Sequence, residues 1–511
     1  MSGRQKAARG GDAIRFVLDG EVRTVEGVAP TTTVLNYLRE TLGRTGTKEG
    51  CAEGDCGACT VVLAELDGDR VRFRAVNSCI QFLPTIDGKE LITVESLKGA
   101  DGTLHPVQRA LVDCHGSQCG FCTPGFVMSL FALYKTRQAP TRAEIGDALS
   151  GNLCRCTGYR PIVDAGVKMY EYGAAREDRH QSWMNCSFSS GADREITRSE
   201  QEMIERLHAI RRGGTLTVRH GAATFHAPVE LKELAALREA HPDARMLAGG
   251  TDVGLWVTKQ HKDLHDILYV GDVAELKEIR DTDAGLEIGA GANLADAYES
   301  LVEHHPELSE LYRRFASPPI RNAGTLGGNI ANGSPIGDSM PVLIVMGATL
   351  VLRKGKRTRE IPLEEFYLAY QKTALEPGEF VLCIRVPHRA PGAQVRTFKI
   401  SKRLDQDISA VCGAYRIVVQ RGRVADARIA YGGMAATPRR ASAAERAING
   451  REWTEATVRA AMAALDDDFT PLTDMRATGA YRKSVARNLL YKFWLETSGA
   501  GAATQVVEFT G

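Results

Sequence analysis

The feature that most constrains this 511-residue chain is the uneven distribution of its 12 cysteines. Nine of them lie between Cys51 and Cys156, whereas the rest of the chain contains only Cys186, Cys383 and Cys412. Cysteines that served only as small buried hydrophobic residues would be scattered along the sequence. Disulfide frameworks are typical of small secreted domains, and this N-terminus lacks the apolar segment of a secretory signal. The clustering therefore predicts metal binding in the first third of the chain.

The first set of cysteines is Cys51, Cys56, Cys59 and Cys79. Its Cys-x4-Cys-x2-Cys spacing, followed by a distant fourth cysteine, is typical of a plant-type [2Fe–2S] cluster. Glycines separate the thiols in KEGCAEGDCGAC, so the loop can wrap around a cluster and point backbone N–H groups at sulfur. A four-cysteine zinc site usually contains two Cys-x2-Cys pairs, and it is the less favoured alternative.

The second set consists of Cys119-x2-Cys122 and Cys154-x-Cys156. Thr123 before Pro124 predicts a helix that starts after the first pair, with Thr123 as its N-cap. A capping box from Thr141 to Glu144 predicts another helix before the second pair. Two such pairs could hold a four-thiolate centre, but the spacing alone leaves open a zinc knuckle or buried cysteines. The remaining cysteines are interpreted as structural or free thiols: Cys114, Cys186, Cys383 and Cys412.

Hydrophobic periodicity predicts the organisation of the chain. Short strands around one helix at 33–41 indicate a mixed α+β unit in residues 13–90, and residues 104–172 have the spacing of four helices. Residues 174–210 are polar and charged, which favours a linker that ends in an amphipathic turn or helix. Strands and helices alternate from residue 214, and strands followed by helices fill 391–503.

Two glycine-rich loops in the alternating region could bind a pyrophosphate through consecutive backbone N–H groups. They are LAGGTDV at 247–253 and RNAGTLGGN at 321–329. Neither is a Rossmann fingerprint, and GAG at 289–291 is rejected as one because Leu294 stands where the third glycine belongs. Glycine loops are often simple turns, so these residues alone do not decide between a turn and a nucleotide site.

Charge and hydropathy exclude several classes of protein. The 64 Lys and Arg residues balance 63 Asp and Glu residues, so there is no basic excess for binding nucleic acid. The longest apolar run, from Met340 to Leu352, is too short to span a membrane and is interrupted by Pro341 and Gly347. No short hydrolytic motif is present. We therefore expect a cytoplasmic protein, with no nucleic-acid or membrane partner, whose chemistry comes from cofactors.

The cysteine segments resemble the iron–sulfur half of the xanthine dehydrogenase family. The similar segments are GTKEGCAEGDCGACTVV, NSCIQFLPTIDGKELITVESL, QCGFCTPGFVMSL and LSGNLCRCTGYRPIVDA. The resemblance implies a β-grasp, ferredoxin-like domain at 1–92 and a four-helix domain at 93–175, each with one [2Fe–2S] cluster. It makes all eight cysteines of the two sets iron ligands. A linker at 176–210 would follow.

The similarity continues to about residue 490 and implies FAD as a further cofactor. The implied domains are an α/β FAD-binding domain of the non-Rossmann (PCMH-like) type at 211–390 and a C-terminal α+β flavoprotein domain at 391–503, before a tail at 504–511. Without the resemblance, Phe315 is better explained as a core residue. The positions that match the family's FAD contacts are Met246, Leu247, Ala248, Gly249, Gly250, Thr251, Asp252, Val253, Phe315, Thr325, Leu326, Gly327, Gly328, Asn329, Asp338, Val381 and Lys399.

The resemblance also implies a partner, because no molybdopterin domain follows the flavin segments. Molybdopterin would be bound by a separate large subunit, in a heterotetramer of two small and two large chains. Purine oxidation to urate would occur there, so this chain would hold no catalytic residue. Electrons would pass through the helical-domain cluster, the ferredoxin-type cluster and FAD to NAD⁺, and the charges of KISKRLDQD at 399–407 would influence the choice of acceptor.

Two alternatives remain open at this point. The chain could be the same module of an aldehyde or N-heterocycle hydroxylase, or a non-catalytic iron–sulfur electron carrier or redox sensor. The doubled glycine loops together with Phe315 speak against a simple carrier.

Overall fold

The computed structural model describes residues 11–99, 101–172, 196, 198–499 and 504. The chain forms two compact units. The first comprises residues 1–237, 243–274 and 317–324, and the second comprises 238–242, 275–316 and 325–511. The finer division into four domains stays a prediction.

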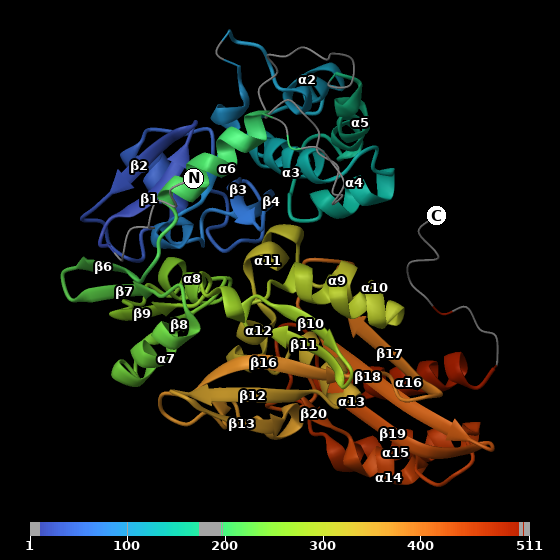
Figure 1. Cartoon of the computed structure of the whole chain (residues 1–511). Helices are drawn as coiled ribbons and strands as arrows, with labels where there is room; N and C mark the ends of the chain where they lie inside the picture. The colour runs from blue at the N-terminus through green and yellow to red at the C-terminus, as the bar shows by residue number, and fades with distance from the viewer. Residues whose placement is uncertain (1–10, 100, 173–195, 197, 500–503, 505–511) are drawn as a thin grey trace. The chain divides into compact units, whose positions relative to one another are not determined.

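The first unit begins with a five-stranded sheet in the order β2-β1-β5-β3-β4. Figure 1 labels strands β1 to β4 of this sheet. The strands are β1 Ile14–Leu18, β2 Glu21–Val25, β3 Thr60–Asp67, β4 Arg70–Asn77 and β5 Glu90–Ile92. Strand β1 pairs with β5 in parallel, and the other pairs are antiparallel. Helix α1 (Val34–Asn36) starts where the Thr33 side chain accepts the N–H of Asn36, and it continues as a π-helix over Tyr37–Thr41. The single helix expected at 33–41 is confirmed.

Four helices follow, as the periodicity predicts: α2 Pro106–Asp113, α3 Thr123–Thr136, α4 Arg142–Leu149 and α5 Arg160–Lys168. The capping box at Thr141 and Glu144 is present. The N-cap of α3, however, is Cys122 rather than Thr123, which already has helical geometry. A proline is tolerated in the first turn because the N–H groups there have no partner within the helix, so the start shifts easily by one residue.

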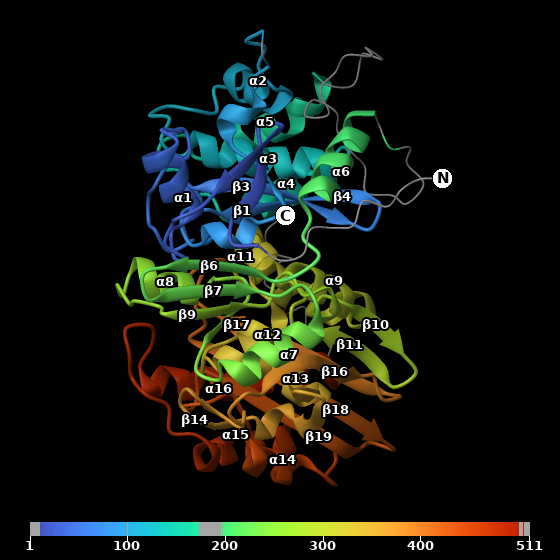
Figure 2. The same cartoon turned by 60° about the vertical axis from the view of Figure 1, so that its left-hand side comes forward.

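The helices and the sheet share one hydrophobic core. Phe126, Phe131 and Tyr134 of α3 pack with Val62 of β3 and Phe73 of β4. Helix α6 (Arg198–Ile210) packs against β1, β3 and β4 (Figure 2). The predicted amphipathic helix is thus present at the end of the linker, and it belongs to this core. The linker residues 176–195, including Cys186, lie outside the described residues.

A second sheet completes the first unit, in the order β6-β7-β9-β8. Its strands are β6 Leu216–His220, β7 Ala223–Ala227, β8 Arg245–Leu247 and β9 Asp266–Tyr269. Helix α7 (Leu231–Ala240) follows β7, α8 (Val253–Thr258) follows β8, and α11 (Pro318–Ala323) returns to this unit. Leu216, Phe225 and Tyr269 pack in one cluster with Phe16 and Val61 of the first sheet.

The second unit contains a five-stranded antiparallel sheet in the order β10-β11-β16-β12-β13 and a four-stranded antiparallel sheet in the order β17-β18-β19-β20. Helix α13 (Ser339–Met346) is buried along its whole length and packs against β16, β18 and β19. It accounts for most of the apolar run seen in the sequence. No helix among the described residues is long and apolar enough to cross a membrane.

The remaining elements of the second unit complete these layers. The strands are β10 Ile279–Thr282, β11 Gly285–Gly289, β12 Thr349–Lys354, β13 Arg357–Pro362, β14 Tyr367–Ala369, β15 Lys372–Thr373, β16 Phe380–Pro387, β17 Ala393–Ile400, β18 Val411–Gln420, β19 Arg423–Gly432 and β20 Arg439–Arg440. The helices are α9 Leu294–His304, α10 Ser309–Arg314, α12 Leu326–Asn332, α14 Ser442–Ile448, α15 Glu455–Asp468 and α16 Gly479–Thr497.

Candidate cofactor sites

The first cysteine loop runs from the end of the π-helix to β3. Left-handed backbone at Ala52, Gly54 and Gly57, with φ of 55°, 80° and 70°, folds the loop back on itself. As a result the N–H groups of Asp55 and Cys56 each lie 3.4 Å from the Cys51 sulfur. Backbone N–H groups that point at sulfur are the arrangement expected around an iron–sulfur cluster.

The four thiols of this loop region lie together. Hydrogen bonds from the Cys56 and Cys79 thiols, with backbone N–H groups, lower the pKa of Cys51. A hydrogen bond from Cys79 likewise lowers the pKa of the buried Cys59, and Asn77 Nδ2 lies 3.8 Å from the Cys59 sulfur. Hydrogen bonds to Cys51 in turn raise the pKa of Cys56 and of Cys79, so the shifts show that the four thiols are close neighbours. The chemistry and placement of these four donors fit a [2Fe–2S] cluster.

The second set of thiols lies between the start of α3 and the loop from α4 to α5. Cys156 and Cys119 have their sulfurs 3.7 Å apart, and the thiols of Cys122 and Cys154 are hydrogen-bonded to each other. The Cys154 sulfur also accepts the N–H groups of Cys156 and Thr157, each at 3.4 Å.

The pairing of these thiols bears on the kind of metal centre. No group of three or more His, Cys, Asp or Glu side chains in the described part of the chain is placed to hold a metal ion. The sulfurs of the second set instead lie two by two, and each iron of a [2Fe–2S] cluster takes two of the four thiolates. The pairing of Cys119 with Cys156 and of Cys122 with Cys154 is compatible with such a cluster.

The other described cysteines are placed differently. Cys383 in β16 and Cys412 in β18 are buried, and burial raises the pKa of both thiols, to about 12 for Cys383. Burial also raises the pKa of Cys114. Neutral thiols of this kind are unreactive, which agrees with their interpretation as structural or free thiols. None of the described cysteines forms a disulfide.

The first glycine loop lies in the first unit, between β8 and α8. A Cβ at Gly249 would lie 1.9 Å from the carbonyl oxygen of Ala323, and Gly250 has a φ of 72°. A Cβ at Gly254 would lie 2.8 Å from the carbonyl oxygen of Ile80. Ile80 follows Cys79 directly, so this loop packs against the backbone next to a thiol of the first set. Sequence reasoning missed Ile80, since no local pattern marks it.

Residues 325–329 of the second glycine loop lie in the second unit and form the start of α12, whereas 321–324 belong to the first unit. Thr325 caps this helix by accepting the Gly328 N–H over 3.0 Å, and Gly327 donates to the Ala290 carbonyl over 3.1 Å. A Cβ at Gly327 would lie 2.5 Å from that carbonyl oxygen. The Asn329 Oδ1 atom is buried without a hydrogen-bond partner in the structure. An orphaned acceptor beside a glycine turn fits a site that receives a polar ligand.

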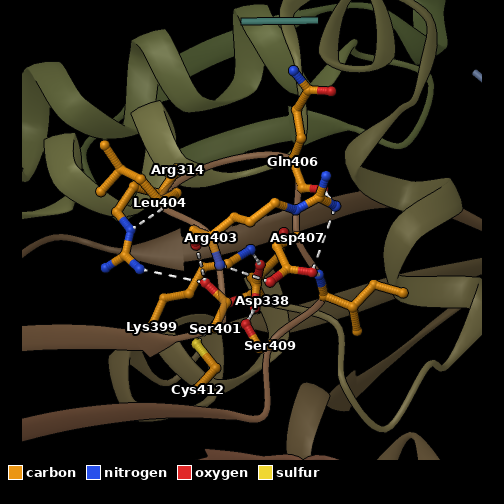
Figure 3. A network of polar contacts seen from close by, with 12 residues as sticks. Arg314, Asp338, Lys399, Ser401, Arg403, Leu404, Gln406, Asp407, Ser409 and Cys412 are labelled. Atoms are coloured by element: carbon orange, nitrogen blue, oxygen red, sulfur yellow. Dashed lines mark hydrogen bonds and ion pairs between the residues drawn. The ribbon is translucent and has the colours of Figure 1, made fainter. Parts of the chain in front are cut away.

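Other predicted FAD positions of the second unit form a buried polar network (Figure 3). Lys399 Nζ lies 2.6 Å from Asp338 Oδ2, and Ser409 donates to Asp338 Oδ1 over 2.5 Å. Arg314 holds the loop after Lys399 in place by donating a hydrogen bond to the Leu404 carbonyl over 2.9 Å. The sequence did not indicate that Asp338 and Lys399 form a pair.

The other two predicted positions lie in the core of the second unit. Phe315 is 7% exposed and packs on Tyr298 with ring centroids 5.5 Å apart, and Val381 is buried in β16. Both placements agree with core residues, so their contacts with FAD stay a prediction.

Comparison with known proteins assigns each of these regions to a domain type. Four family models match: the 2Fe-2S iron-sulfur cluster binding domain at 16–83, the [2Fe-2S] binding domain at 93–167, the FAD binding domain in molybdopterin dehydrogenase at 219–389, and the CO dehydrogenase flavoprotein C-terminal domain at 396–497. The chain belongs to the molybdenum hydroxylase family that includes xanthine dehydrogenase. Its cofactors are accordingly two [2Fe–2S] clusters and FAD, and it forms the electron-transfer module of this family.

Individual relatives support the same family. A xanthine dehydrogenase of Emericella nidulans is 34% identical over 94% of this chain and 38% of its own length. Aldehyde oxidase 1 of Bos taurus is 32% identical over 96% of this chain and 40% of its own length. A solved structure, reconstituted CO dehydrogenase from Oligotropha carboxidovorans, matches with a TM-score of 0.51 and 26% identity, over 55% of this chain and 99% of that one. The chain thus spans well under half the length of the curated relatives it matches.

Proposed function

We propose that this chain is the FAD and iron–sulfur subunit of a xanthine dehydrogenase. The proposed ligands are the two sets of four cysteines, and the proposed FAD contacts are residues 246–253 and 325–329 with Phe315, Asp338, Val381 and Lys399. Bound FAD collects single electrons and releases them as a hydride. The protein's own residues contribute position, hydrogen bonds to sulfur and exclusion of water.

One observation carries this proposal: within the first unit, the two cysteine sets and the first glycine loop follow one another through direct backbone contacts. The N–H of Leu153, beside Cys154, donates to the carbonyl of Cys56 over 3.0 Å. The first glycine loop then packs on Ile80, beside Cys79. This continuity supports an electron path from the helical-domain cluster through the ferredoxin-type cluster to FAD.

The remainder of the proposal concerns groups outside this chain. A large partner subunit would bind molybdopterin and oxidise xanthine or hypoxanthine to urate, and NAD⁺ would accept the hydride from FAD. We expect two small and two large chains in a cytoplasmic heterotetramer. The identity of 34% to a xanthine dehydrogenase over nearly the whole chain supports this choice of substrate.

The first experiment is an anaerobic titration of the purified chain with NADH. The chain should contain about four irons and one FAD, and NADH should bleach the flavin and both clusters. A chain that contains zinc and no flavin would overturn the proposal. A chain with all its cofactors that NADH does not reduce would overturn NAD⁺ as the acceptor.

A second experiment tests the substrate. The chain, co-purified with its partner, should reduce NAD⁺ with xanthine. The similarity to aldehyde oxidase 1 supplies the alternative, a hydroxylase of aldehydes or N-heterocycles. Turnover of such compounds without turnover of xanthine would favour that alternative.

A further inference from the structure

The two cysteine loops approach each other closely because glycines stand where they meet. A Cβ at Gly57 would lie 2.1 Å from the carbonyl oxygen of Gly151, and a Cβ at Gly125 would lie 2.1 Å from that of Gly57. The φ of 70° at Gly57 adds a second reason for glycine at that position. A side chain at either position would force the loops apart. The approach allows the hydrogen bond between Leu153 and Cys56.

Asn152 fastens the two loops beside this hydrogen bond. Its Nδ2 donates to the Gly57 carbonyl over 3.1 Å and lies 3.4 Å from Thr60 Oγ1. Its Oδ1 accepts the hydroxyl of Ser129 over 2.6 Å. The Asn152 side chain is only 4% exposed, so these bonds form away from water. A substitution that removes the amide would leave buried polar groups unsatisfied on both sides.

We propose that Asn152 is a positioning residue for electron transfer between the two iron–sulfur centres. It keeps in place the hydrogen bond from Leu153 to Cys56. This bond connects Cys56, a proposed ligand of the first cluster, to the residue that precedes Cys154, a proposed ligand of the second cluster. The bonded route runs from the Cys56 sulfur to its carbonyl, across this hydrogen bond, and through Leu153 to Cys154. The inference rests on the proposed assignment of these cysteines as cluster ligands.

The chemistry of this step is simple. A transfer of one electron oxidises one centre and reduces the other. No covalent bond breaks, and no proton moves at Asn152. The contribution of Asn152 is therefore geometric, and it should alter the rate of transfer rather than the reduction potential of either centre.

The test compares Asn152→Leu with Thr136→Val in the complete enzyme. Leucine has a similar volume but donates no hydrogen bond, and Thr136 lies in α3, like Ser129, with its hydroxyl bonded to Ala132 in the same helix. Freeze-quench EPR follows electron equilibration between the clusters, and potentiometry gives both reduction potentials. Asn152→Leu should slow equilibration severalfold at unchanged potentials, because the rate of electron tunnelling falls as the bonded route between the two centres lengthens. Thr136→Val should behave as the unmodified enzyme.

The failures are distinguishable. Equilibration at the unmodified rate in an Asn152→Leu enzyme that retains both clusters would overturn the role of Asn152 alone. Fewer than about four irons in the unmodified chain would overturn the proposed function, which assigns the eight cysteines as cluster ligands. If Asn152→Leu itself loses iron, EPR of the fully reduced unmodified enzyme tests instead whether the bonded route couples the two clusters. An isotropic exchange component in the spin–spin splitting supports the bonded route, and a purely dipolar splitting overturns it.

Discussion

Lys399 and Asp338 form an ion pair in the interior of the second unit, with Nζ 2.6 Å from Oδ2 and side chains that are 2% and 7% exposed. The residues come from β17 and from the N-terminus of α13, so the pair joins the four-stranded sheet to the helix buried between the sheets. Ser409 supplies a further hydrogen bond to the carboxylate. Both residues are proposed FAD contacts, and their pairing gives them a structural role as well.

The first prediction concerns this pair. Asp338→Asn leaves the Lys399 ammonium buried without a counter-charge, so it should lower the free energy of unfolding by about 3 kcal/mol. The double variant Asp338→Asn with Lys399→Met should recover part of that loss. Denaturant unfolding monitored by tryptophan fluorescence measures both. Glu455→Gln, which breaks the exposed pair with Arg459, is the control and should cost less than about 1 kcal/mol. Equal effects at the two sites would contradict the prediction.

The second prediction concerns the first glycine loop. Gly249→Ala places a Cβ against the Ala323 carbonyl, and because backbone cannot easily give way, the loop must shift. The purified variant should lose most of its FAD while it keeps its iron. Flavin absorbance after denaturation and an iron assay measure the two cofactors. Gly146→Ala is the matched control, since its Cβ would meet nothing within 4 Å, and it should keep both. Retention of FAD by Gly249→Ala would argue against this loop as a flavin contact.

Local patterns in the sequence predicted more of this molecule than long-range contacts did. The spacings of Cys51 to Cys59 and of Cys119 to Cys122 predicted two sets of thiols that the structure brings together. The capping box at Thr141 also depends only on neighbours, so it was predictable. By contrast, the contact of Gly254 with Ile80 and the bonds of Asn152 to Gly57 join segments far apart in sequence. No periodicity encodes such contacts. Helix α6 was expected as the end of a linker because its polar face obscured Met203 and Leu207, which the core buries.

The third prediction concerns pH. Burial raises the pKa of Glu90 in β5 to about 7, although the nearby Arg206 opposes the shift. The folded state therefore keeps the Glu90 proton up to about pH 7, whereas the unfolded state loses it near pH 4.5. The free energy of unfolding should therefore fall as the pH rises through this window. Between about pH 4.5 and 7 the unmodified chain should lose about 3 kcal/mol of stability relative to Glu90→Gln. Unfolding midpoints at pH 5 and 8 measure the difference. Glu26→Gln, an exposed control, should show no such dependence.

The last prediction tests the second set of thiols against a neighbouring cysteine. Cys119→Ser removes a proposed ligand, so iron should fall from about four to about two per chain and one of two EPR signals should vanish. Electron transfer from purine to FAD should stop, while transfer from NADH to a dye through FAD persists. Cys114→Ser is the control: Cys114 is half-buried at the C-terminal end of α2, and its loss should leave iron and both activities unchanged. Equal loss of both activities in Cys119→Ser would contradict the proposed electron order, because a flavin at the far end of the path should still react with NADH.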